Sequence, residues 1–104
     1  MEIIKHQNGC DLTIEISGRL DTTTVTEAQT VLEECYEGTT HLVLDLKGLT
    51  YISSMGLRLV LMAQKHMMKQ GHMEIIGVNE HIMGIFDDVG FSDVMTIKPL
   101  TSNL

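Results

Sequence analysis

The sequence predicts an α/β domain built on a mixed β-sheet. Two observations support this prediction: a hairpin signal near the start of the chain, and an alternation of strand-like and helix-like segments after it. Hairpin strands are antiparallel, whereas strands joined through helices pair in parallel, so one sheet would contain both directions. We expect about four to five strands and about three to four helices in a single domain over residues 1–104.

The hairpin is predicted from residues 2–7 and 11–17, which flank Asn8-Gly9, a dipeptide typical of two-residue turns. In its second strand apolar and polar residues alternate, which predicts one buried face. A loop is expected over residues 18–23.

The first helix is predicted to begin after Thr24, and Glu27 three residues later suggests a capping box. Gly38 lies just past the expected end. The apolar residues of this helix recur on one side, as in a surface helix packed on a sheet; they are Val25, Ala28, Val31, Leu32 and Cys35.

The middle of the chain is predicted to form a central strand over residues 41–46, a turn at Lys47-Gly48, and a helix that begins at Ser54 and lasts to Gly71. The residues of this helix expected to face the core are Leu57, Val60, Leu61, Gln64 and Met68.

The last part of the chain is predicted to add a strand at 73–76, a helix capped by Asn79 and closed by Gly90, and an edge strand at 94–97. The residues of that helix expected to face the core are Ile82, Ile85, Phe86 and Val89.

The composition excludes several classes of function. A net charge of -7 and a pI near 5.0 argue against binding to nucleic acids or anionic membranes. No apolar run approaches the ~18 residues that a membrane span requires, so no membrane insertion is expected. Cys10 and Cys35 are too far apart for a metal or redox motif, and two free thiols fit a reducing cytoplasm.

Catalytic and metal-binding motifs are also missing from the sequence. It contains no nucleophile elbow, no Walker loop and no dinucleotide-binding glycine motif, so we expect no enzymatic activity and no cofactor. No metal site is expected, because the five histidines lack a ligand spacing such as His-x-x-x-His; they are His6, His41, His66, His72 and His81.

Two adjacent hydroxyls mark the predicted start of the middle helix. The first N–H groups of a helix have no partner within it, and the helix dipole places partial positive charge there. An anion at Ser53 or Ser54, including a phosphate on a serine, would therefore be stabilised.

Several segments between about residues 12 and 97 resemble a STAS domain of the anti-sigma factor antagonist type. They are Gly18-Arg19-Leu20-Asp21, the strand at 41–46, Tyr51-Ile52-Ser53-Ser54-Met55-Gly56-Leu57-Arg58, and Val89-Gly90-Phe91. The resemblance implies a STAS-like fold, which agrees with the α/β layout predicted above.

In that family the helix usually begins Asp-Ser-(Ser, Thr or Ala)-Gly-Leu, and the serine after the aspartate accepts the phosphate. Alignment on Gly56-Leu57 makes Ser54 the acceptor and Ser53 the second candidate. The sequence departs from the pattern twice: Ser53 replaces the aspartate, and the bulky Met55 occupies the variable position.

The function implied by the resemblance is that of a bacterial anti-sigma factor antagonist in a partner-switching pathway. Its unphosphorylated form would bind an anti-sigma factor that is also a serine kinase, so that the sigma factor is released. The kinase would phosphorylate Ser54, and a PP2C-type phosphatase would reverse the reaction. The alternative is a STAS subunit that regulates or assembles a membrane transporter of the ABC lipid type without phosphorylation.

The expected partner-binding surface surrounds the helix start. By resemblance, Asp21 lies near the phosphorylation loop, and Thr22 extends the same edge. Arg58, one turn after Ser54, can reach back toward a phosphate. The full set is Asp21, Thr22, Ser53, Met55, Gly56, Leu57, Arg58 and Met62, whose methionines suit an adaptable contact. One exposed sheet edge would also allow weak homodimerisation.

Overall fold

The structure is a computed structural model that describes residues 1–100. The described residues form six strands, three α-helices and one 3-10 turn, in the order β1 (Glu2–Asn8), β2 (Asp11–Leu20), α1 (Val25–Cys35), β3 (His41–Asp45), β4 (Leu49–Ile52), α2 (Ser54–Met68), β5 (His72–Val78), α3 (Glu80–Asp88), η1 (Phe91–Asp93) and β6 (Thr96–Pro99).

The strands form one mixed sheet in the order β1-β2-β3-β5-β6. β1 and β2 are antiparallel, as the Asn8-Gly9 turn predicted, and Gly9 has the positive φ of 65° that such turns require. The other pairings are parallel. The predicted mixed α/β fold is therefore confirmed.

β2 is the longest strand and continues through the predicted loop as far as Leu20. Its first half pairs with β3, and its last three residues pair with β4, which the sequence analysis did not predict. A register shift between Gly18 and Arg19 separates the two pairings. Four residues with little apolar alternation are a weak strand signal, so this strand depends on the neighbouring β2.

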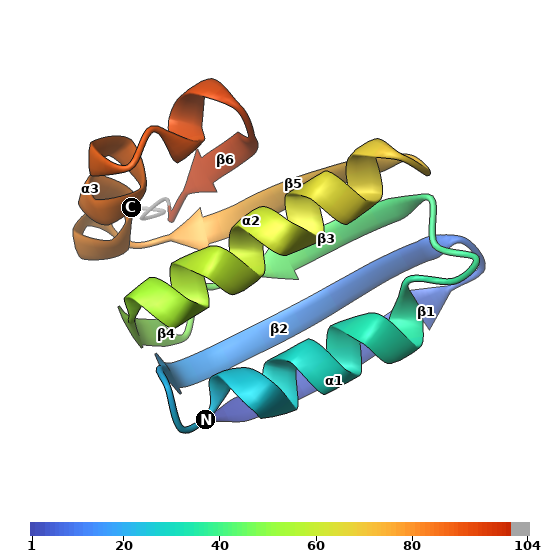
Figure 1. Cartoon of the computed structure of the whole chain (residues 1–104), viewed down its shortest axis with the longest axis horizontal. Coiled ribbons are helices and arrows are strands. Elements are labelled where there is room, and N and C mark those ends of the chain that lie inside the picture. Colours follow the sequence, from blue (N-terminus) through green and yellow to red (C-terminus); the bar gives the residue numbers. More distant parts are fainter. Residues whose placement is uncertain (101–104) are drawn as a thin grey trace, which may run out of the picture.

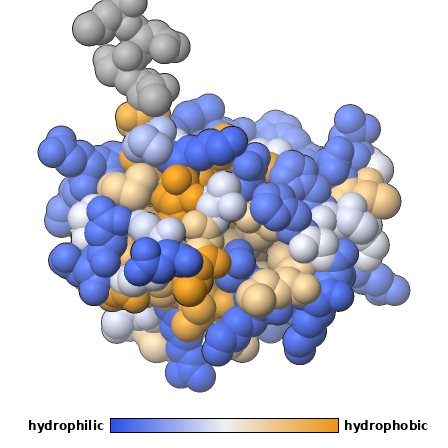
Figure 2. Space-filling view, turned by 90° about the horizontal axis from the view of Figure 1, so that it is seen from above, coloured by the Kyte–Doolittle hydropathy of each residue, from blue (hydrophilic) through white to orange (hydrophobic). Residues whose placement is uncertain are grey.

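Helices α1 and α2 lie side by side over one face of the sheet (Figure 1). The core between these layers includes Leu12 and Ile14 of β2 and Leu42 and Leu44 of β3, all almost fully buried. Phe86 of α3 belongs to the same buried cluster. On the face shown in Figure 2, an apolar area is surrounded by hydrophilic side chains. Across residues 1–100, no helix has both the length and the apolar character needed to span a bilayer.

The capping box predicted at Thr24 is wrong. Thr24 has helical backbone angles and its side chain makes no cap hydrogen bond to α1. Its Oγ1 instead donates to the backbone oxygen of Arg19 at 2.8 Å and accepts the backbone N–H of Asp21 at 2.9 Å. The predicted cap at Asn79 is confirmed, because its side chain accepts the N–H of Ile82 at 2.8 Å.

The predicted inward face of α2 is only partly right. Val60 is buried and Leu57, Leu61 and Gln64 are half-buried, but Met68 is 71% exposed. The face against the sheet contains Gly56, Leu59, Val60, Ala63 and Met67. Apolar residues occur on the exposed side of α2 as well as on the side that packs against the sheet, so their spacing in the sequence did not identify the buried side. Val89, which follows the last residue of α3 as its C-cap, was also wrongly assigned to the core, since it is 49% exposed.

Candidate functional site

Strand pairing brings two separate candidate segments together. Leu20, the last residue of β2, is the register partner of Ile52, the last residue of β4. The segments that follow these two strands begin at Asp21 and Ser53, and they therefore start next to each other at the carboxyl ends of β2 and β4. The N–H of Ser53 donates to the backbone oxygen of Leu20 at 2.9 Å and joins the two directly.

The two adjacent serines have different environments. Ser53 is the N-cap of α2: its backbone is extended, it is half-buried, and its Oγ accepts the N–H of Gly56 at 3.2 Å. Ser54 is the first residue of the helix and is exposed. Among residues 1–100, no other side chain or backbone group hydrogen-bonds to the Ser54 hydroxyl. Ser54 is therefore the exposed member of the pair, whereas the hydroxyl of Ser53 caps the helix.

Gly56 is buried and allows close packing beneath the helix start. A Cβ at this position would lie 2.7 Å from Ile52 Cγ1 and 3.0 Å from the backbone oxygen of Leu20. Leu57 is half-buried against the core. These two predicted site residues thus place α2 on the ends of β2 and β4, while Met55 and Arg58 beside them are exposed.

Asp21 organises the loop that precedes α1. Its Oδ1 accepts the N–H of Thr23 at 3.0 Å, the hydroxyl of Thr23 at 2.7 Å and the N–H of Thr24 at 3.2 Å. These bonds favour the ionised carboxylate and lower the pKa of Asp21 from 3.8 to about 2, with the Thr23 hydroxyl as the largest cause. Asp21 is therefore a local turn residue as well as part of the candidate surface, and Thr22 beside it is exposed.

Arg19 and Tyr51 extend this surface and were not among the predicted site residues. They are register partners on β2 and β4, and the guanidinium carbon of Arg19 lies 4.1 Å from the centre of the Tyr51 ring. The Nε of Arg19 is also 3.6 Å from Oδ2 of Asp21. Only the unpredicted β4 pairing could have indicated this contact.

A groove of about 770 Å³ runs between α1 and α2, and we call it the α1–α2 groove. It reaches the α2 start, because Met55 and Arg58 line it, and Met62 lines it one turn further on. The full lining is Val25, Gln29, Leu32, Glu33, Tyr36, Glu37, Met55, Arg58, Leu59, Met62, His66 and Gln70. Three predicted partner-binding residues are therefore brought together on one concave surface.

The groove continues to a stacked aromatic pair. The rings of Tyr36 and His66 are 3.9 Å apart and inclined by 17°. Burial, with the negative charge of Glu33 as a smaller cause, raises the pKa of Tyr36 to about 12. Met55 and Met62 are 40% and 54% exposed, so this part of the surface offers flexible apolar contacts.

Comparisons with known proteins identify the family and relatives of the chain. Residues 2–103 match the STAS domain family. The anti-sigma-B factor antagonist of Staphylococcus epidermidis is 31% identical over 100 residues, which cover 94% of this chain and 91% of that protein.

Solved structures extend the likeness to the fold. An anti-sigma factor antagonist from Mycobacterium paratuberculosis aligns with a TM-score of 0.87 at 14% identity, over 94% of this chain and 85% of that one. The Bacillus cell fate determinant SpoIIAA, in its phosphorylated form, aligns with a TM-score of 0.75 at 16% identity, over 92% of this chain and 90% of that one.

Proposed function

The chain belongs to the STAS domain family, and we propose that it acts as an anti-sigma factor antagonist controlled by phosphorylation of Ser54. In this proposal the unphosphorylated chain binds an anti-sigma factor with serine kinase activity, and the sigma factor is released. The chain is a substrate of that kinase and of a PP2C-type phosphatase, and it catalyses no reaction itself.

The observation that carries the proposal is the contrast between the two serines at the start of α2. Ser54 is exposed, and the hydroxyl of Ser53 accepts the N–H of Gly56. Ser53 occupies the place of the family aspartate, and a serine serves the capping role there as well as an aspartate does. The related fold of SpoIIAA has been described in a phosphorylated form, which supports the same modification here.

The proposed switch depends on charge. A phosphate adds about -1.5 to -2 charges to a chain whose net charge is already -7. The start of α2 and a nearby arginine such as Arg58 stabilise it by about 0.3–2 kcal/mol in the free chain. In the centre of an interface an incompletely paired charge costs about 3–5 kcal/mol, so loss of binding exceeds the local gain.

The proposed partner surface combines the loop at Asp21 and Thr22 with the α2 start and the adjacent end of the α1–α2 groove. Met55 and Met62 would provide its apolar contacts, and Arg58, one turn after Ser54, lies between these two methionines in the sequence. Gly56 and Leu57 contribute by holding the helix in place, since Gly56 is buried and Leu57 is half-buried.

Intact-mass spectrometry tests the proposal directly. The purified chain is incubated with ATP and the serine kinase encoded beside its gene, and the mass of one added phosphate is expected. Ser54→Ala should abolish the addition, whereas the matched variant Ser53→Ala should retain it. An unchanged mass would favour the transporter-subunit alternative, and a phosphate mapped to Ser53 would reject the assignment of Ser54.

A further inference from the structure

The sheet has a second face, opposite α1 and α2, that carries an unassigned cluster of side chains. In β3 and β5 the buried Leu42 and Met73 face the helices, so the residues next to them face the other way. Two of these residues, His41 and His72, are the first residues of their strands. The cluster thus lies at the opposite end of the parallel strands from Ser54.

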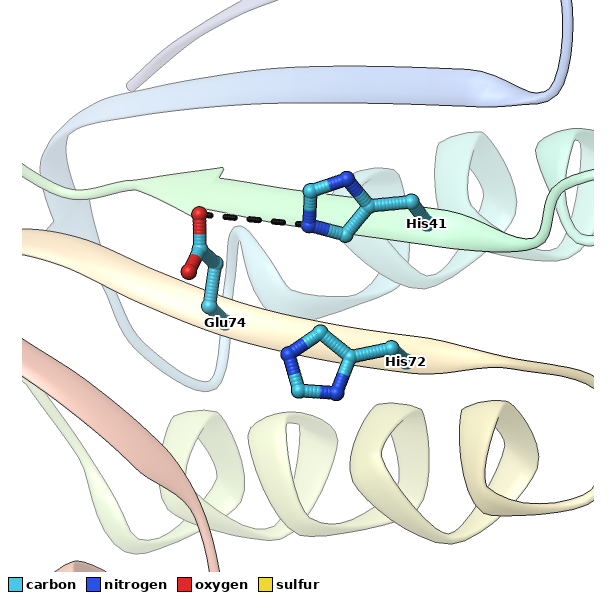
Figure 3. Close-up of side chains that lie close together, drawn as sticks. All are labelled: His41, His72 and Glu74. Atoms are coloured by element: carbon cyan, nitrogen blue, oxygen red, sulfur yellow. Dashed lines mark ion pairs between the residues drawn. The ribbon is translucent and has the colours of Figure 1, made fainter.

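Strand register brings three potential metal ligands together. His41 and His72 are directly paired on the parallel strands β3 and β5, with ring centres 5.6 Å apart. Glu74 shares the face of His72 because it is two residues further along β5, and its Oε1 lies 3.9 Å from Nε2 of His41 (Figure 3). One ligand atom from each of the three residues lies within 4.8 Å of the other two.

Two imidazole nitrogens and one carboxylate oxygen are a ligand set that suits Zn²⁺. Tetrahedral coordination at about 2.0–2.2 Å would place the ligand atoms about 3.4 Å apart. The side chains would therefore have to approach by up to about 1.4 Å from their 4.8 Å spacing. Because His72 is exposed and His41 is partly exposed, changes of side-chain torsion can supply this movement without disturbing the core.

Two further charged residues lie beside the cluster. Asp11, the β2 register partner of His41, places Oδ1 3.7 Å from Nδ1 of that ring, so a carboxylate lies near the other nitrogen of the imidazole. On the other side, Nζ of Lys98 is 3.4 Å from Oε2 of Glu74. This ammonium group competes with a cation for the carboxylate.

We propose that His41, His72 and Glu74 form a binding site for a zinc-class divalent cation, with a fourth position open to water. The site is independent of the proposed phosphorylation, because it lies on the other face of the sheet and at the other end of the strands. Sequence spacing could not indicate it, since His41 and His72 lie on strands separated by β4 and α2.

The test is titration of the untagged full chain with Zn²⁺, measured by calorimetry and by competition with a chromophoric chelator. One ion per chain is expected, and His41→Ala, His72→Ala and Glu74→Gln should each weaken binding by about tenfold or more. His81→Ala, an exposed histidine on α3, and Cys10→Ser, an exposed thiol, are the matched controls and should keep the affinity of the original chain.

Two further measurements identify the ligands. Imidazole ¹H–¹⁵N NMR should show zinc-dependent shifts for His41 and His72 but not for His81. Lys98→Met should tighten binding, because it removes the cation that pairs with Glu74. No saturable binding, equal affinity in the ligand and control variants, or unchanged affinity in Lys98→Met would overturn the assignment.

Discussion

The Oγ of Ser53 accepts the backbone N–H of Gly56 at 3.2 Å, and this bond distinguishes Ser53 from the adjacent Ser54. The first serine satisfies a helix donor that would otherwise lack a partner within the helix. The second, Ser54, remains exposed at the positive end of the α2 dipole. The phosphate that we propose at Ser54 would therefore leave the cap intact.

Ser54→Asp is expected to abolish binding to the anti-sigma factor, whereas Ser54→Ala retains it. A charge left without a full set of partners costs about 3 kcal/mol or more at an interface, which corresponds to at least about a 100-fold weaker affinity. Calorimetric titration with the purified partner measures both variants. Equal binding by the two would remove Ser54 from the mechanism.

Ser53→Ala is expected to destabilise the fold by about 0.5–2 kcal/mol, because the helix loses its cap. Ser54→Ala should change the free energy of unfolding by less than about 0.5 kcal/mol, because Ser54 is exposed. Urea denaturation followed by circular dichroism compares them. The assigned cap would be wrong if Ser54→Ala proved the more destabilising of the two.

Gly56→Ala is expected to destabilise the chain by about 1–3 kcal/mol, although alanine is usually the better helix former. The added Cβ would lie 2.7 Å from Ile52 Cγ1 and 3.0 Å from the backbone oxygen of Leu20. Gly84→Ala in α3 is the matched control, since within residues 1–100 no atom beyond its chain neighbours and the adjacent helix backbone lies within 4 Å of its added Cβ. That control should gain about 0.5–1 kcal/mol in the same denaturation assay. A similar gain in Gly56→Ala would contradict the close packing of Gly56 on Ile52 and Leu20.

Asp21 should make stability depend on pH in acid. Its folded pKa of about 2 lies below the ordinary value of 3.8, so the ionised form stabilises the fold. This contribution is complete above about pH 4 and is lost as the pH falls toward 2. The Tm advantage of the original chain over Asp21→Asn should therefore shrink across this range in thermal melts; a constant difference would indicate that ionisation of Asp21 is not involved.

Met62→Gln is expected to weaken partner binding by about 1–2 kcal/mol, or about 5- to 30-fold, because Met62 lines the α1–α2 groove beside the proposed interface. The control is Met68→Gln on the same helix, which is 71% exposed and lies outside the groove. Neither change should affect stability. Equal affinities would place the interface elsewhere.

Local patterns in the sequence were sufficient for much of the fold. The Asn8-Gly9 turn predicted the hairpin, and Asn79 and Gly90 predicted the ends of α3, because each depends on the chemistry of a few neighbouring residues. Local reasoning failed at Thr24, whose hydroxyl bonds to Arg19 and Asp21 and not to the helix. The path of the chain at the end of β2 places the backbone groups of Arg19 and Asp21 within hydrogen-bonding distance of the Thr24 hydroxyl.

The sequence by itself determined the mixed α/β class, the acidic surface, and a helix that begins with two serines. Only the tertiary structure decided which serine is exposed and which residues lie beside it. Pairing of β2 with β4 places Asp21 beside Ser53, and packing of α1 beside α2 forms the groove that contains Met62. Such contacts join residues far apart in the chain, so they follow from strand register and helix packing and not from local patterns.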